Sequence, residues 1–407
     1  MKRSVFASVA VAVLLCGCGA SHGSSERVTV GCSTAQAPAH TFTGARTSML
    51  AVRGSPFGVA STGDGRWSFV DETTGAVAVF ADASDPPRLL RTIAVPGEAV
   101  GNSLADGGRL LLVAGVGPDA QEASVLSVAA ATSGAGNAEL GVLRSPHPLG
   151  GGGPIEVSGT PDGAYAFVSV EYGDRVDVFN LRAALRGGFK RSTYVGSISL
   201  GDAVVGQALS PDGRWLYVTS ELAGSLRAVL RHGGPGALKK TPGTLSVISV
   251  AKAEAGERQA VAATVHAGCQ PARVAVAPGG ATVWVTARAS DDLLAFSASQ
   301  LISHPAHALL ASVRVGEAPV GLAFVNAGRW IAVADSNRFG ARGAHSEITL
   351  VDAAAALAHR PAVLGTIRAG SFPREMSLEG NGRILLVGNW GSGQLETIEL
   401  PGRSTTG

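Results

Sequence analysis

Short runs of alternating apolar and polar residues, each interrupted by a glycine turn, recur along most of the chain. In ALSPDGRWLYVTSELAG an apolar run precedes the turn 211–213, and a β-rich run follows it from Arg214 to Thr219. Alternation on both sides of a tight turn predicts a β-hairpin, with Ser210 and Asp212 as turn residues. Six further copies align on the turn glycine Gly213, at Gly65, Gly108, Gly163, Gly280, Gly328 and Gly382.

These copies define seven units of one design. Consecutive turn glycines are 43–67 residues apart, near the roughly 40–50 residues typical of one β-propeller blade. Further β-rich segments follow the hairpins, for example RVDVFNL and then VGSISL. We therefore predict an all-β fold: a seven-bladed β-propeller of four-stranded antiparallel blades.

The two ends of the repeat region predict how the ring closes. The seventh unit ends with QLETIEL at Leu400 and lacks a fourth strand, whereas RTSMLAV at 46–52 precedes the first hairpin without a partner. The N-terminal strand is expected to complete the last blade, because an unclosed ring would leave open sheet edges. The propeller then spans residues 46–400, and residues 401–407 form a C-terminal tail.

Composition and charge narrow the classes of partner. The 407 residues include 55 glycines and are 45% hydrophobic, which fits many short strands joined by tight turns in one closed ring. The formal net charge of +2 argues against nucleic acid, which requires a concentrated basic surface. The histidines are scattered, so we expect no metal site, and no phosphate-binding loop opens a helix, so we expect no other cofactor. We also expect a monomeric protein.

The first residues have the pattern of an export signal. A basic start precedes an apolar run, Val5–Leu15, that is too short to span about 30 Å of hydrocarbon. The run ends in LCGC, which resembles a bacterial lipobox, and Cys18 fits the lipidated position better than Cys16 because bulky Leu15 precedes Cys16.

We interpret residues 1–17 as a lipoprotein signal peptide and residues 18–45 as the lipidated Cys18, a tether and an N-terminal segment. The expected location is the cell envelope, on the periplasmic or extracellular side of a membrane; an ordinary secreted protein is the alternative. Export makes a disulfide between Cys32 and Cys269 possible, the alternative being two unpaired, partly buried thiols.

Polar residues recur where each second strand ends and where each inner strand begins, and both places lie at one end of a propeller's channel. Three residues after the corresponding valine stand Thr73, Val116, Glu171, Glu221, Arg288, Ser336 and Trp390; the inner strands add Glu156, Gln207, Gln270, Arg273, Arg374 and Glu375. A concave polar mouth is the default location of a ligand site. We expect ligand binding by Glu156, Glu171, Gln207, Glu221, Gln270, Arg273, Arg288, Arg374 and Trp390, and a Glu221–Arg288 pair across adjacent blades.

Two insertions are expected at the same end of the ring. Residues 222–243 follow Glu221, and NRFGARGAH follows Ser336. Long insertions on one face of a rigid scaffold often carry binding specificity. Both insertions are therefore expected to cover the channel mouth.

The repeats SPDGRWLYVTSE and PGGATVWVTARASDDLLAFS resemble YVTN-type β-propeller repeats and the broader lactonase-like seven-bladed superfamily, over about Arg46 to Leu400. In the lactonase branch, a Glu after the second strand of the fourth blade, an Arg after that of the fifth and a His at an inner strand are associated with the active site. This sequence matches the first two at Glu221 and Arg288. It has Glu156 in GGGPIEVSGTPDG where the His would stand.

The polar channel mouth and the family resemblance suggest two alternative functions. The first is a membrane-tethered scaffold that binds a small molecule, a glycan or an envelope protein in the polar mouth. The alternative is a lactonase-like hydrolase or isomerase acting on a small lactone or sugar acid. There Arg288 or Arg273 would stabilise an oxyanion, and Glu221 would move a proton if neighbouring carboxylates raised its pKa.

Overall fold

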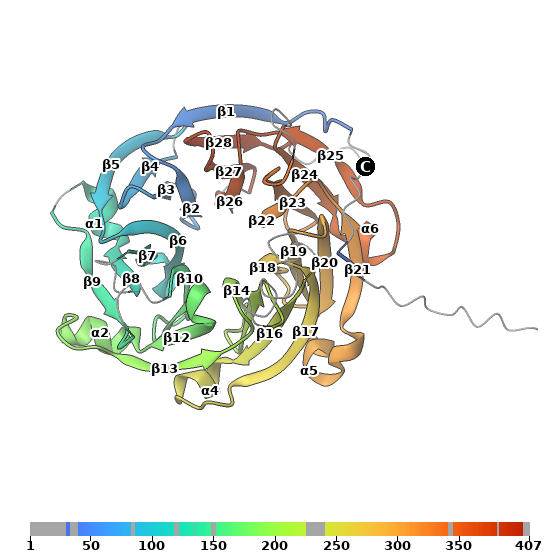
Figure 1. The fold of residues 1–407 in the computed structure, drawn as a ribbon. Helices are drawn as coiled ribbons and strands as arrows, with labels where there is room; N and C mark the ends of the chain where they lie inside the picture. The colour runs from blue at the N-terminus through green and yellow to red at the C-terminus, as the bar shows by residue number, and fades with distance from the viewer. Residues whose placement is uncertain are drawn as a thin grey trace, which may run out of the picture.

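Seven four-stranded antiparallel sheets surround a central axis (Figure 1), which confirms the predicted propeller. The computed structural model describes residues 30–32, 40–82, 86–117, 122–134, 136–147, 152–224, 241–340, 345–380 and 382–401. Residues 1–17, Cys18, most of insertion 222–243 and nearly all of the C-terminal tail lie outside these ranges.

The blades follow one another along the chain, each with its innermost strand first. Blade 1 comprises β2 (Pro56–Ser61), β3 (Trp67–Glu72), β4 (Ala76–Ala81) and β5 (Arg88–Ala94); blade 2 comprises β6 (Glu98–Ala105), β7 (Leu110–Val116), β8 (Glu122–Ser127) and β9 (Glu139–Arg144). Blade 3 comprises β10 (Pro154–Gly159), β11 (Ala166–Val170), β12 (Arg175–Phe179) and β13 (Tyr194–Ser199); blade 4 comprises β14 (Val204–Leu209), β15 (Trp215–Ser220), β16 (Pro242–Ser249) and β17 (Val261–Cys269).

The remaining three blades have the same order. Blade 5 comprises β18 (Pro271–Val276), β19 (Thr282–Ala287), β20 (Asp292–Ser297) and β21 (Leu309–Arg314); blade 6 comprises β22 (Pro319–Val325), β23 (Trp330–Asp335), β24 (Glu347–Asp352) and β25 (Val363–Arg368). Blade 7 comprises β26 (Pro373–Leu378), β27 (Ile384–Asn389), β28 (Gln394–Glu399) and, from the N-terminus, β1 (Arg46–Ala51).

Short helices, which the sequence analysis did not predict, follow the third strand of blades 2 to 6. They are α1 (Val128–Ser133), α2 (Leu181–Gly187), α4 (Val250–Glu254), α5 (Ala298–Ser303) and α6 (Ala353–Leu357); the 3-10 turns are η1 (Asp106–Gly108), η2 (Glu171–Gly173) and η4 (Pro305–His307). The α-helices lie on the outer rim of the ring (Figure 1), away from the channel.

The turn after each inner strand has the predicted role. Ser210 Oγ donates to Asp212 Oδ1 at 2.5 Å and accepts from the backbone N–H of Trp215 at 3.0 Å. The same arrangement joins Thr160 to Asp162 at 2.7 Å. Gly213 adopts a φ of 69°, a conformation that glycine reaches without a steric penalty. The hydroxyl of Ser210 is therefore engaged in hydrogen bonds within the turn, as expected for a turn residue.

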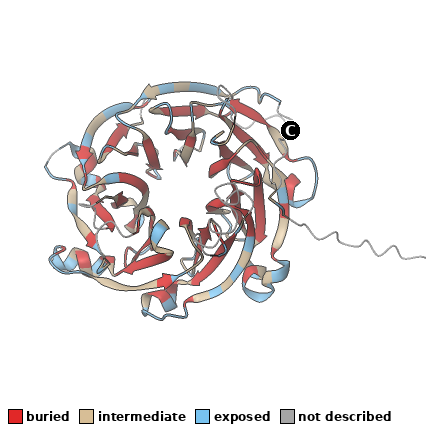
Figure 2. Ribbon diagram, in the orientation of Figure 1, coloured by how far each residue is buried: buried red, intermediate tan, exposed pale blue. Residues whose placement is uncertain are grey.

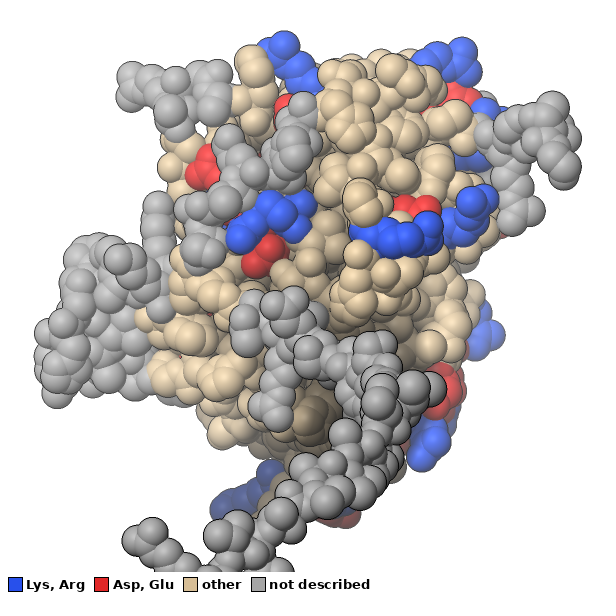
Figure 3. Space-filling model, turned by 90° about the vertical axis from the view of Figure 1, so that its right-hand side faces the viewer, with Lys and Arg blue, Asp and Glu red and all other residues tan. Residues whose placement is uncertain are grey.

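The apolar core lies between blades. In the described part of the chain the buried apolar residues form seven clusters, one at each junction of adjacent blades. The inner three strands are mostly buried, whereas residues of the outermost strands are mostly intermediate or exposed (Figure 2), so blade-to-blade packing holds the ring together. On the side shown in Figure 3, basic and acidic side chains are interspersed among uncharged ones.

The N-terminal segment closes the ring as predicted. β1 pairs antiparallel with β28, with Arg46 opposite Glu399 and Ala51 opposite Gln394. Just before β1, Thr41 forms a parallel bridge with Thr366 of β25 in blade 6. Further upstream, a disulfide joins Cys32 to Cys269, the last residue of β17 in blade 4, with a Cα–Cα distance of 5.4 Å. The described residues of this N-terminal segment thus contact blades 4, 6 and 7.

Glycines on four inner strands allow neighbouring strands to approach closely. A Cβ on Gly206 would lie 2.5 Å from the Ala272 carbonyl oxygen and 2.8 Å from Thr219 Oγ1. Gly58, Gly101 and Gly321 would meet the carbonyl of the next inner strand in the same way. These glycines therefore set the spacing of the inner ring.

Gly206→Ala is expected to lower the free energy of unfolding by about 1–3 kcal/mol, because strand β18 must move to admit the methyl group. Urea unfolding measures the change. Gly196→Ala in β13 is the matched control, since nothing lies within 4 Å of its added Cβ. Equal stability of the two variants would contradict the proposed role of Gly206.

Candidate functional site

Every inner strand has a register irregularity near its start, and one position recurs two residues after the last pair before that irregularity. That position is glycine in blades 1, 2, 4 and 6 and charged in blades 3, 5 and 7: Gly58, Gly101, Gly206, Gly321, Glu156, Arg273 and Glu375. Bulges re-aim side chains and are common next to functional sites. Here three alternate blades each contribute one charged side chain.

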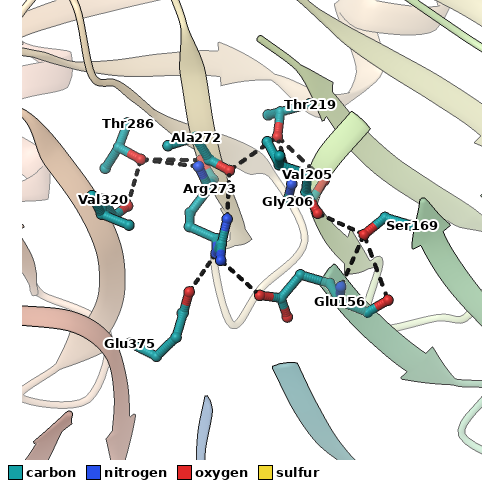
Figure 4. Close-up of polar contacts among 10 residues, drawn as sticks. All are labelled: Glu156, Ser169, Val205, Gly206, Thr219, Ala272, Arg273, Thr286, Val320 and Glu375. Carbon is teal, nitrogen blue, oxygen red and sulfur yellow. Dashed lines mark hydrogen bonds and ion pairs between the residues drawn. The ribbon is translucent and has the colours of Figure 1, made fainter. Parts of the chain in front are cut away.

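These three charged residues form a triad (Figure 4). Arg273 Nη2 lies 2.9 Å from Glu156 Oε1, and Arg273 Nε donates to Glu375 Oε1. The Arg273 side chain is only 7% exposed. Because Glu156 and Glu375 come from blades 3 and 7, Arg273 of blade 5 joins two blades that are not its neighbours.

Hydroxyl groups on the second strands fix the backbone around the triad (Figure 4). Ser169 Oγ accepts from Glu156 N–H at 3.0 Å and donates to the Val205 carbonyl at 2.7 Å. Thr286 Oγ1 accepts from Arg273 N–H at 3.1 Å and donates to the Val320 carbonyl at 2.6 Å. Each hydroxyl thus links its own inner strand to that of the next blade and restricts the position of the charged residue.

The predicted Glu221–Arg288 pair is present. Arg288 Nη2 donates to Glu221 Oε1 at 2.6 Å and to Gln270 Oε1 at 3.3 Å. Gln270 has a φ of 50° immediately before β18, next to the disulfide at Cys269. Glu221 and Arg288 therefore lie at one end of the ring, as the repeat alignment requires, and Gln270 is part of the same contact.

Glu171 differs from the other carboxylates of this group. It begins η2, is partly buried, and makes no ion pair with any residue that the structure describes. Burial, and then the charge of Glu221, raise the pKa of its carboxyl, while Arg374, Arg288 and Arg273 oppose the shift. Glu171 therefore combines a raised pKa with the lack of an ion-pair partner among the described residues, which suits it to exchange a proton with a ligand.

Exposed aromatic rings adjoin these charges. Tyr172 follows Glu171 and is 72% exposed. Trp390 is 40% exposed and packs edge-on against Phe372, with ring centroids 5.4 Å apart. Flat exposed rings provide apolar contact area for a ligand that also carries polar groups.

Arg338, a residue that the sequence analysis did not select, belongs to the same environment. Burial and the charge of Arg288 lower its pKa, whereas Glu221 and Glu171 raise it. The sixth-blade insertion therefore brings a cation near the site, in line with the expectation that it lies at the channel mouth. Insertion 222–243 falls mostly outside the described residues.

Arg374, next to Glu375 on β26, has an aromatic partner rather than an acidic one. Its guanidinium lies 3.7 Å from the centroid of the Phe57 ring of blade 1. Its Nε is buried without a hydrogen-bond partner among the described residues. Burial, and then repulsion by Arg273, lower its pKa to about 9.

We call this group the central cluster: Glu156, Glu171, Glu221, Arg273, Arg288, Arg374 and Glu375. Gln207 does not join it, because its Nε2 donates to the Phe167 carbonyl of blade 3 at 2.8 Å. Asn102 makes the equivalent contact with Phe69 at 3.4 Å. Gln207 therefore links blades 4 and 3, and it is not part of the proposed site.

Among the described residues, no group of three or more His, Cys, Asp or Glu side chains is arranged to hold a metal ion.

Glu156 makes stability depend on pH. Burial raises its pKa to about 8, Arg273 opposes the shift and Glu375 adds to it. Because the folded pKa lies above the ordinary value, the stabilisation is complete at acid pH and is lost as the pH rises through about 8. Glu156→Gln keeps the neutral form, so its free energy of unfolding should fall less between about pH 6 and pH 9, by on the order of 1 kcal/mol.

Urea unfolding across this pH range tests the effect, with exposed Glu257→Gln as control. Glu122, whose pKa burial and Asp177 also raise to about 8, leaves part of the slope in every variant. Identical pH profiles for Glu156→Gln and the wild type would show that Glu156 stays ionised.

Comparison with known proteins agrees with this architecture. The family model described as lactonase, 7-bladed beta-propeller, matches residues 156–339, from the inner strand of blade 3 into the sixth blade. Over this segment, which contains Glu171, Glu221, Arg273 and Arg288, the chain matches the lactonase family of seven-bladed β-propellers. Arg374 and Glu375 lie outside the matched segment. A search of curated proteins found no significant match.

One similar solved structure is hydrazine synthase of Kuenenia stuttgartiensis. The TM-score is 0.63 with 16% sequence identity, over 87% of this chain and 97% of that chain. At this identity the likeness concerns the fold alone. The described helices include none long and apolar enough to cross a membrane.

Proposed function

We propose that this propeller binds a small polar ligand at the end of the ring formed by the central cluster. The observation that carries the proposal is Glu171, a partly buried carboxyl without an ion-pair partner among the described residues, beside the paired Glu221 and Arg288. A ligand hydroxyl or amine would give this carboxyl a close polar partner in addition to the neighbouring Tyr172. Exposed Tyr172 and Trp390 add flat apolar surfaces.

The chain is, in this proposal, an exported protein tethered to the cell envelope through a lipid on Cys18. The Cys32–Cys269 disulfide fits an oxidising compartment. Cys18→Ala should release the protein from the membrane fraction. Unchanged fractionation of that variant would remove the lipid anchor from the proposal.

A lactonase-like hydrolase is the second candidate, because the family model matches and because the pKa of Glu171 is raised. Ionised Glu171 would take a proton from the attacking water, and an arginine of the cluster would stabilise the oxyanion on the lactone carbonyl. The proton then passes to the ring oxygen as the C–O bond breaks. Glu221 is less suited to this step than the sequence predicts, because Arg288 holds it at 2.6 Å.

A thermal-shift screen of lactones, sugar acids and oligosaccharides, read together with acid release in a pH-stat, separates the two candidates. A binding protein is stabilised by a compound that it leaves intact, and Glu171→Gln removes that stabilisation while Glu257→Gln does not. A lactonase releases acid, and Glu171→Gln abolishes the release. Stabilisation that survives both Glu171→Gln and the double change Glu221→Ala, Arg288→Ala would move the site elsewhere.

A further inference from the structure

The charges of the central cluster do not pair off completely. Arg273 holds Glu156 and Glu375, and Arg288 holds Glu221. Arg374 makes no ion pair or hydrogen bond with any residue that the structure describes. One partly buried cation is therefore left without an acidic partner.

The surroundings of Arg374 do not compensate for this charge. Two acidic side chains whose charges act on Arg374, Glu156 and Glu375, lie against the guanidinium of Arg273 instead. A third, Glu171, interacts with its charge but forms no ion pair with it. The Phe57 ring covers the Arg374 guanidinium at 3.7 Å, which favours a cation but supplies no hydrogen-bond acceptor. A buried guanidinium with an unsatisfied N–H normally carries a substantial free-energy penalty.

We propose that Arg374 is the anchor for a carboxylate group of the bound ligand. This inference rests on the proposed ligand-binding function and names the chemical class of the ligand as a small monocarboxylate. A guanidinium presents its N–H groups as a planar fork that matches a carboxylate in two parallel hydrogen bonds. Binding would satisfy the unpaired donors and neutralise the unpaired charge at once.

A monocarboxylate fits better than a phosphate. Among the described residues, Arg374 is the one arginine of the central cluster without an ion pair, and Glu156 and Glu375 lie in the same cluster. A dianion would leave an excess negative charge beside these two carboxylates, in a site where burial weakens screening. A ligand with a single negative charge therefore fits beside Arg374 better than a dianion does.

The test uses glycolate as probe, glycolamide as its uncharged counterpart, and inorganic phosphate as the dianion, at constant ionic strength. Glycolate should raise the melting temperature of the full mature protein in a saturable manner, and glycolamide should not. Arg374→Gln should weaken the glycolate response at least about tenfold. Arg258→Gln, an exposed arginine after α4, is the matched control and should respond like the wild type.

A second readout needs no ligand. Arg374 forms no ion pair with a described residue, so Arg374→Gln should leave the melting temperature of the ligand-free protein unchanged or raise it. Arg273→Gln breaks the contacts with Glu156 and Glu375 and should lower the melting temperature. A drop in Arg374→Gln as large as that in Arg273→Gln would show that Arg374 already has a partner, and would overturn the proposal.

The outcomes separate this inference from the proposed function. If an uncharged compound stabilises the protein through Glu171 but no carboxylate acts through Arg374, ligand binding stands and the carboxylate anchor fails. If glycolate acts through Arg374 and Glu171→Gln has no effect, the anchor stands and Glu171 is not part of the site. An equal response to glycolate and glycolamide, or a stronger response to phosphate, would contradict the assignment of a monocarboxylate.

Discussion

Replacement of Arg273 by methionine is expected to lower the free energy of unfolding by about 3–5 kcal/mol, the usual cost of removing one partner from a buried ion pair. Among the described residues, Arg273 is the one that forms ion pairs with both Glu156 and Glu375. Methionine fills much of the same volume but leaves the Glu375 carboxylate and the Glu156 carboxyl without a guanidinium partner. The loss should appear as a lower urea midpoint with an unchanged slope.

Two further variants identify the cause of that loss. Adding Glu156→Gln and Glu375→Gln to Arg273→Met removes the two acidic groups that have lost their partner. The triple variant should therefore regain a large part of the stability. Arg258→Met, at an exposed position, should be close to neutral. If the triple variant were as unstable as Arg273→Met alone, lost packing rather than unpaired charge would explain the effect.

The blade architecture could be predicted from the sequence because its signals are local. A turn glycine such as Gly213 is required by its φ of 69°, and the alternating runs on either side specify which face of each strand is buried. Ring closure followed from counting strands: the last unit lacked one and the N-terminus had one to spare. The observed pairing of β1 with β28 confirms this count.

The short rim helices were missed because each is only five to seven residues long. Their signal is an N-cap residue followed by a small helix-favouring run. Ser127 Oγ accepts from Ala130 N–H at 3.3 Å, and Asp352 Oδ1 accepts from Ala355 N–H at 2.8 Å. Such runs are too short to stand out against the β pattern.

The sequence predicts which residues lie at the site better than it predicts which of their side chains contact one another. Repeat alignment placed Glu221 and Arg288 on adjacent blades, and their contact follows from that register. The triad joins blades 3, 5 and 7, whose side chains meet only because seven strands converge on one axis. Gln207 was assigned to the site because an alignment does not show that its amide reaches the carbonyl of Phe167.

Deletion of β1 is expected to destabilise the entire ring rather than one blade. The deletion removes the strand that pairs with β28 over six residues, from Arg46 opposite Glu399 to Ala51 opposite Gln394. It also removes Leu50, which packs against the cluster between blades 7 and 1, and exposes a sheet edge. Burial of such side chains alone is worth about 2–4 kcal/mol, so the loss should be at least of this size.

The comparison that isolates β1 uses two chains, one starting at Arg46 and one at Arg53, both with Cys269→Ser. Neither chain has the Cys32 disulfide or the bridge at Thr41, so the difference between them belongs to β1 alone. Because each blade packs its apolar side chains mainly against its two neighbours, opening the junction of blades 7 and 1 converts a closed ring into an open stack with two free ends. The shorter chain should therefore unfold at a lower urea concentration when followed by tryptophan fluorescence and by circular dichroism alike. Coincident unfolding of the two chains would mean that blade 7 is stable with three strands and that β1 does not close the ring.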